Sequence, residues 1–62
     1  MSEISQAVSE AYDILVADGV APQQAATIAT LSEEQWKTGQ IKRDPVAYAR
    51  HFVELRKAAR GE

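Results

Sequence analysis

The sequence predicts an all-α fold of three to four helices in a single domain that spans residues 1–62. Three observations support this prediction. Apolar residues recur at helical spacing in two long segments, about 3–18 and 45–60. Residue types that begin and end helices punctuate the chain between these segments. No stretch alternates between apolar and polar residues in the way that a half-buried β-strand does.

The first helix is predicted over about 3–18. The apolar residues of its inner stripe, three or four positions apart, are Ile4, Val8, Ala11 and Leu15. This spacing places all four on one side of a helix. Ser2 is the expected N-cap. Gly19 is expected to end the helix, because glycine adopts the left-handed conformation after a helix without steric cost.

The middle of the chain is predicted as two short helices, about 22–30 and 33–38, because two signals for a helix start lie close together. Pro22 suits the first turn of the earlier helix. Ser32 and Gln35 have the spacing of a capping box, which predicts a break in the helix near Ser32. One continuous helix through Ser32 is the alternative.

The last helix is predicted over about 45–60. Asp44 is its expected cap, and Pro45 suits its first turn. Gly61 is expected to end it, as Gly39 ends the helix before. Its apolar stripe consists of Tyr48, Phe52, Leu55 and Ala59. The predicted core residues of the whole domain are Leu15, Ile28, Leu31, Trp36, Ile41, Tyr48, Phe52 and Leu55.

Charge is distributed unevenly along the chain. Residues 1–34 contain six acidic residues and no basic one, whereas residues 35–62 contain seven basic and three acidic ones. The net charge of the chain is −2. Such asymmetry can mark a partner-binding surface, and it can also draw the two halves together within one fold or between two copies.

Little in the sequence predicts an enzyme. The chain has no cysteine, which excludes disulfides and thiolate metal sites. His51 is the one histidine, so no second imidazole can complete a metal site, and no nucleophile stands beside it within its helix. We therefore expect no catalytic residue, no metal site and no cofactor.

A cytoplasmic location is expected. The longest wholly apolar run, residues 14–17, is far shorter than the roughly 18 residues that a membrane helix needs. The first basic residue is Lys37, so the positively charged start of a secretory signal is missing.

Protein binding is the function class that we favour. The last helix is expected to carry a small apolar strip edged by positive charge, and the candidate partner-binding residues are Arg43, Val46, Arg50, Val53 and Lys57. The expected partner is another protein with an acidic surface, or a second copy whose first helix is acidic. The chain would then act as a small regulator or inhibitor, as many short bacterial and phage proteins do.

A nucleic-acid-binding regulator is the alternative. Residues 22–38 can be threaded onto a helix-turn-helix, and the basic last helix could contact phosphates. Two observations count against this alternative. Glu33 and Glu34 open the second helix of the motif and would repel phosphate. No aromatic residue is interleaved with the basic residues of the last helix to stack on bases.

Two segments resemble parts of known helical families. Asp18-Gly19-Val20 followed by Ala25 and Leu31 resembles the loop and second helix of ubiquitin-associated domains.

A second set of residues, Asp18-Gly19 and then Gly39-Gln40-Ile41 with Asp44, resembles the short helical antitoxins of Fic-type toxins. Those antitoxins carry a Ser-x-x-x-Glu motif that blocks the toxin's nucleotide site, whereas this chain has Ile14 and Asp18 at the matching positions. Both resemblances imply a small interaction module, and neither implies a family.

Overall fold

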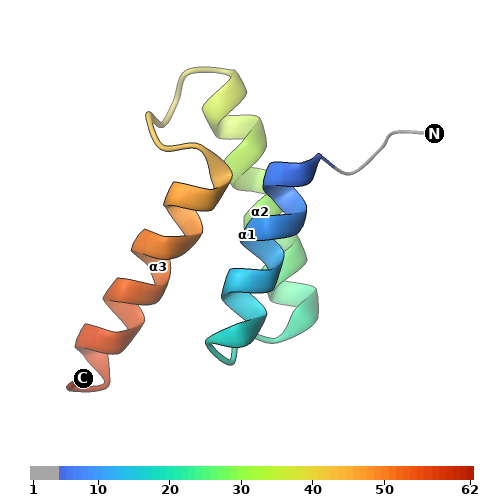
Figure 1. Cartoon of the computed structure of the whole chain (residues 1–62). Coiled ribbons are helices and arrows are strands. Elements are labelled where there is room, and N and C mark those ends of the chain that lie inside the picture. Colours follow the sequence, from blue (N-terminus) through green and yellow to red (C-terminus); the bar gives the residue numbers. More distant parts are fainter. Residues whose placement is uncertain (1–4) are drawn as a thin grey trace.

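Three helices form the structure, a computed structural model that describes residues 5–62 (Figure 1). They are α1 (Gln6–Ala17), α2 (Pro22–Lys37) and α3 (Pro45–Ala59). Successive helices run in opposite directions, so α1 and α3 point the same way and α2 runs against both (Figure 1). Within residues 5–62 there are helices and no strand, which confirms the predicted all-α class.

α3 begins at Pro45, as predicted. α1 begins at Gln6, three residues later than predicted. The Asp44 carboxylate accepts a hydrogen bond from the Ala47 N–H at 2.8 Å, as expected of an N-cap. At α1 the cap is Ser5, whose hydroxyl oxygen accepts from the Val8 N–H at 3.1 Å. The predicted cap Ser2 and the predicted stripe residue Ile4 lie outside the described residues.

The first turn between helices confirms the prediction for Gly19. This glycine has a φ of 95°, which an L-residue with a side chain rarely adopts. The Gly19 N–H donates to the Val16 carbonyl at 2.9 Å, and the Val20 N–H donates to the Leu15 carbonyl at 3.0 Å. This pair of bonds closes the end of α1 as a Schellman motif, with Val20 buried beneath it.

The predicted break at Ser32 is wrong. α2 is one helix from Pro22 to Lys37, so the continuous alternative is confirmed. The side chain of Ser32 is 2% exposed and points into the bundle, where its hydroxyl donates to the Ala29 carbonyl at 2.8 Å. A serine whose hydroxyl bonds back to the preceding turn is compatible with a helix interior. Ser32 is therefore a buried helix residue and not a cap.

The core is built mainly from alanine. The buried hydrophobic residues are Val8, Ala11, Leu15, Val20, Ala25, Ala29 and Ala49. Alanine lets helices approach closely, but each one buries little apolar area. A single core in a domain of this size supplies only about 3–5 kcal/mol of net stability. Among the predicted core residues, Leu15 is the one that is fully buried.

α3 turns a different face to the core than predicted. Pro45 and Ala49 are buried, whereas Tyr48 and Phe52 are partly buried and Leu55 is 57% exposed. Neighbouring residues of a helix point about 100° apart, so the buried face is rotated away from the predicted stripe. The predicted stripe lies along one edge of the buried face.

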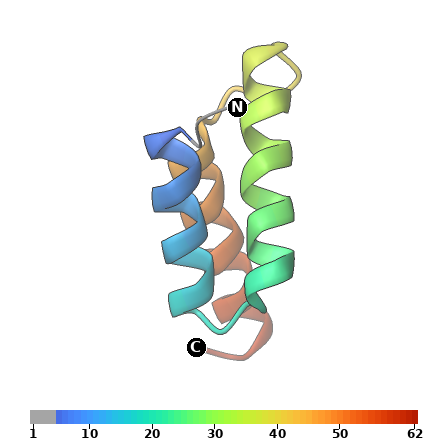
Figure 2. The ribbon, with the colours of Figure 1, turned by 90° about the vertical axis from the view of Figure 1, so that its right-hand side faces the viewer.

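Two predicted core residues of α2 are also exposed. Leu31 is 50% exposed and Trp36 is 41% exposed. Trp36 lies in the last turn of α2, and this end of the helix extends past the start of α1 (Figure 2). Ile28 and Ile41 are partly buried.

An ion cluster around Asp18 joins the end of α1 to the end of α3. The Arg56 Nε donates to Asp18 Oδ2 at 2.9 Å. The Arg60 guanidinium donates to both carboxylate oxygens, at 3.0 Å to Oδ1 and 3.2 Å to Oδ2. The Asp18 side chain is 10% exposed. The acidic half of the chain therefore contacts the basic half within one fold, which is one of the expected consequences of the charge asymmetry.

This cluster makes the stability of the domain depend on pH in a defined range. Hydrogen bonds from Arg60 and then Arg56 lower the pKa of the Asp18 carboxyl from 3.8 to about 2. A carboxyl whose pKa is lower in the folded state stabilises the fold fully above its unfolded pKa, and this contribution is lost as the pH falls through the folded pKa. We expect thermal unfolding to show wild type more stable than Asp18→Asn at neutral pH. The difference should shrink below about pH 4 and be lost as the pH falls below 2.

Asp13→Asn provides the control, because Asp13 is an exposed carboxylate of the same helix. It should track the wild-type melting temperature over the whole pH range. A wild-type advantage over Asp18→Asn that persists undiminished at pH 2 would contradict the assignment of this pH dependence to Asp18.

Candidate interaction surface

Neither a metal cluster nor a membrane span is found in the described part of the chain. Residues 5–62 contain no group of three or more His, Cys, Asp or Glu side chains placed to hold a metal ion. No helix formed by these residues has both the length and the apolar character needed to cross a bilayer. His51 is exposed on α3.

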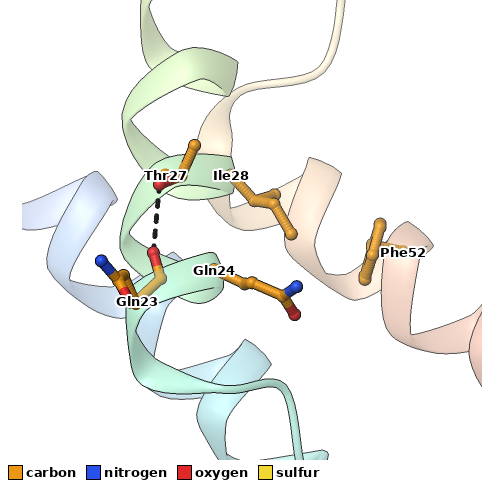
Figure 3. Close-up of a pocket in the computed structure, with 5 residues that line it drawn as sticks. All are labelled: Gln23, Gln24, Thr27, Ile28 and Phe52. Carbon is orange, nitrogen blue, oxygen red and sulfur yellow. Dashed lines mark hydrogen bonds between the residues drawn. The ribbon is translucent and has the colours of Figure 1, made fainter.

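An open groove with both polar and apolar lining residues lies between α2 and α3. Its volume is about 570 Å³, and it is lined by Gln23, Gln24, Thr27, Ile28 and Phe52. Figure 3 shows Ile28 and Phe52 pointing toward each other from the two helices, with the Gln24 side chain extending toward α3. The Thr27 hydroxyl donates to the Gln23 carbonyl at 3.0 Å, so its donor is already used within the helix and its oxygen can still accept.

Two exposed leucines lie three residues from the apolar lining residues of this groove, one on each helix, although neither lines the groove itself. Leu31 follows Ile28 by three residues on α2, and Leu55 follows Phe52 by three residues on α3. Residues three apart lie on the same side of a helix. Leu31 and Leu55 are 50% and 57% exposed, respectively. We call this surface, made of Ile28, Leu31, Phe52, Leu55 and the half-buried Tyr48, the α2/α3 face.

None of the five residues of the α2/α3 face is formally charged. At about 100° per residue, Gln24, Thr27, Gln35, His51 and Ala59 lie on the same side of the two helices. Two exposed acidic residues stand at the edge of the face, Glu34 three residues after Leu31 and Asp44 four residues before Tyr48. Depletion of charge around exposed apolar side chains is typical of the centre of a protein–protein interface.

The predicted partner-binding strip lies on the opposite flank of α3. Its three basic residues, Arg43, Arg50 and Lys57, are exposed. Arg50 and Lys57 form no ion pair with another of residues 5–62. The two valines are less accessible, because Val46 is half-buried and Val53 packs against the core. The structure thus places Arg50 and Lys57 on one flank of α3 and Arg43 in the bend before the helix, and it uses part of the apolar strip for folding.

A second hollow lies between α1 and α2. Its volume is about 230 Å³, and its lining residues are Val8, Ser9, Tyr12, Ala26 and Thr30. Val8 is buried and Tyr12 is half-buried, so this hollow adds no large exposed apolar side chain to the surface. The α2/α3 face is the stronger candidate for binding.

One version of the nucleic-acid alternative needs a helix-turn-helix in residues 22–38. This motif does not form, because Pro22–Lys37 is a single continuous helix. Two basic residues at the end of α3, Arg56 and Arg60, are engaged by Asp18. The basic last helix therefore keeps Arg50 and Lys57 as its candidates for phosphate contact.

Comparison of the chain with protein-family models, with curated proteins and with solved structures found no match. The partial resemblances to ubiquitin-associated domains and to Fic antitoxins therefore lead to no family assignment.

Proposed function

We propose that this chain is a non-enzymatic protein-interaction module that binds an apolar helical surface of another polypeptide through the α2/α3 face. The observation that carries this proposal is the exposure of Leu31 and Leu55, each three residues from an apolar residue that lines the open groove. Contiguous apolar surface of this kind on a small domain commonly marks a binding site. A groove between two helices is suited to an amphipathic helix, which inserts side chains spaced three or four residues apart.

The chemistry of the groove supports a polypeptide partner over a nucleic acid. Ile28 and Phe52 offer apolar contact at its centre. Gln23 and Gln24 at its edge have both donors and acceptors, which suit the polar rim of a protein interface. Nucleic-acid affinity depends on neutralising phosphates with Lys and Arg, and the α2/α3 face has neither.

The basic flank of α3 is a second surface that we propose for protein contact. Arg50 and Lys57 are the exposed residues that would meet an acidic partner. The two proposed surfaces lie on opposite flanks of one helix, so variants of α3 can separate them.

Leu55→Glu and the double variant Arg50→Glu/Lys57→Glu form a matched test. We expect Leu55→Glu to weaken capture of a bound polypeptide at least about 30-fold, because a charge in the centre of an apolar interface removes a hot-spot contact. The double variant should retain that polypeptide. Capture is measured by co-purification from the source cells, with quantitative mass spectrometry of the bound material.

Both variants place glutamate at exposed helix positions, so far-UV circular dichroism should show unchanged helicity. Equal capture by wild type and Leu55→Glu would refute binding through the α2/α3 face. Bound material that nuclease removes would refute a protein partner and favour the nucleic-acid alternative.

A further inference from the structure

We infer that the end of α3, residues 54–60, is a unit that opens separately from the rest of the domain and that the Asp18 ion cluster clamps to the bundle. The closed clamp holds this segment against the end of α1. The open form releases it while the remainder of the bundle stays folded. Three features support this two-state behaviour: the distribution of burial along α3, the polar contacts of its end and the geometry of the cluster.

Burial along α3 is concentrated in its first turns. The buried residues of this helix are Pro45 and Ala49, and Val53 is the last hydrophobic residue that packs against the core. Within residues 54–62, every residue except Arg56 is exposed. Apolar packing therefore contributes little to holding the end of the helix in place. Segments with few buried apolar contacts open at a lower free energy than the core of the same protein.

The polar contacts of this segment with the rest of the bundle converge on Asp18. Arg56 donates to one carboxylate oxygen of Asp18, and Arg60 donates to both. No other hydrogen bond or ion pair among the described residues joins residues 54–62 to residues 5–40. Figure 1 shows the ribbon of α3 diverging from α1 toward the C-terminus, so the long arginine side chains bridge the two helix ends.

The geometry of the cluster suits a clamp. Its centre is fixed, because the Asp18 N–H donates to the Leu15 carbonyl at 3.2 Å and the Asp18 side chain is largely shielded from solvent. Hydrogen bonds between ionised groups are about twice as strong as those between neutral ones. The two bonds from the planar guanidinium of Arg60 also set the orientation of the helix end. The anchor of the clamp thus lies at the end of α1, and its two arms lie on α3.

Opening of the clamp would change the apolar surface of the domain. Leu55 belongs to the clamped segment, whereas Phe52, three residues earlier, packs against the core. The closed form therefore presents these two side chains together on one side of α3. The open form would detach Leu55 from that surface and leave Phe52 in place. The clamp gives α3 two states that differ in the apolar surface they present.

Native-state hydrogen exchange, followed by NMR at increasing urea below the unfolding transition, tests this inference. In wild type, the amides of Ala58, Ala59 and Arg60 should exchange faster than the amide of Ala29 in the core. Their exchange should not respond to low urea, because local opening exposes little surface. In Asp18→Asn their exchange should be at least about 10-fold faster, because hydrogen bonds to a charged group are lost.

Two controls isolate the cluster from other effects of charge. Asp13→Asn changes an exposed carboxylate of α1 and should leave the exchange of the last α3 amides unchanged. Arg60→Gln and Arg50→Gln form a matched pair on α3. Arg60→Gln removes the paired bonds to the carboxylate and should accelerate exchange at Ala58 and Ala59. Arg50 forms no ion pair with another of residues 5–62, so Arg50→Gln should exchange as wild type does.

Either of two results would overturn the inference. Wild-type amides at the end of α3 that show the same urea dependence as Ala29 would mean that this segment opens only with the whole domain. Equal exchange at Ala58 in wild type, Asp18→Asn and Arg60→Gln would mean that the cluster does not clamp it. Should Asp18→Asn fail to fold, Arg60→Gln decides the question. Neither measurement involves a bound polypeptide, so the proposed function stands or falls separately, by the capture test of Leu55→Glu.

Discussion

Replacing Leu15 with alanine is expected to leave the domain largely unfolded at 25 °C. Leu15 is 0% exposed and is the largest fully buried side chain among the described residues. Truncating a buried leucine to alanine costs about 2–5 kcal/mol, because apolar burial is lost and a cavity remains. This cost is comparable to the roughly 3–5 kcal/mol that a core of this size supplies. Loss of the helical signal in far-UV circular dichroism is the measurement.

Leu31→Ala is the control for this prediction, because it makes the same chemical change at a residue that is 50% exposed. In dilute solution it should reduce the free energy of unfolding by less than about 1 kcal/mol, since little apolar area is lost to the fold. Urea unfolding curves of the two variants give the comparison. A Leu15→Ala protein that keeps the wild-type urea midpoint would show that Leu15 is not the centre of the core.

Enlarging Ala49 to leucine is expected to destabilise the domain by about 1–3 kcal/mol or more. Ala49 is 1% exposed on the buried face of α3. Because protein interiors are close-packed, three further carbon atoms at this position should displace a neighbouring helix. If α3 packed through the predicted stripe of Tyr48, Phe52 and Leu55, Ala49 would lie outside the contact and its enlargement would change stability little. The urea midpoint should fall in proportion to the loss of stability.

Ala47→Leu is matched to this variant, since it makes the same change two residues away at an exposed position of α3. It should alter stability by no more than about 0.5 kcal/mol. Equal effects of the two substitutions would mean that α3 does not pack through Ala49.

Local signals in the sequence predicted most helix ends, because the chemistry of those ends is contained in a few neighbouring residues. Asp44 followed by Pro45 is sufficient to start α3, since the cap bond reaches only to Ala47. Gly19 is likewise sufficient to end α1, since the conformation it permits is needed at that one residue. Prediction of the all-α class succeeded because the helical spacing of apolar residues and the lack of strand-like alternation are also features of short stretches of sequence.

The capping box at Ser32 failed because a local signal competes with packing. The residue types at Ser32 and Gln35 are those of a helix start, but position 32 continues the buried side of α2 after Ala25 and Ala29. Burial of Ser32 against the other helices and its bond to the Ala29 carbonyl keep the helix continuous. The spacing of Ala25, Ala29 and Ser32 predicts that Ser32 is buried in a continuous helix, but only if alanine is counted as a core residue.

The candidate site was missed for a related reason. Large apolar residues at helical spacing are usually core, so Leu31, Phe52 and Leu55 were expected to face inward. The small residues beside them allow closer contact between helices, and the side of α3 at Ala49 packs instead. Arg56 on that same side is held by Asp18 across 38 residues of sequence, a contact that no local pattern reports. The large residues are left at the surface, where they form the α2/α3 face.

The lack of formal charge on the α2/α3 face also determines how a contact made there responds to its surroundings. Ionic strength acts by screening ionised groups, and this face offers none to screen. Apolar contact instead weakens on cooling and strengthens with excluded salts such as sulfate. Contact made by these five side chains would therefore respond to temperature and to excluded salts more than to charge screening.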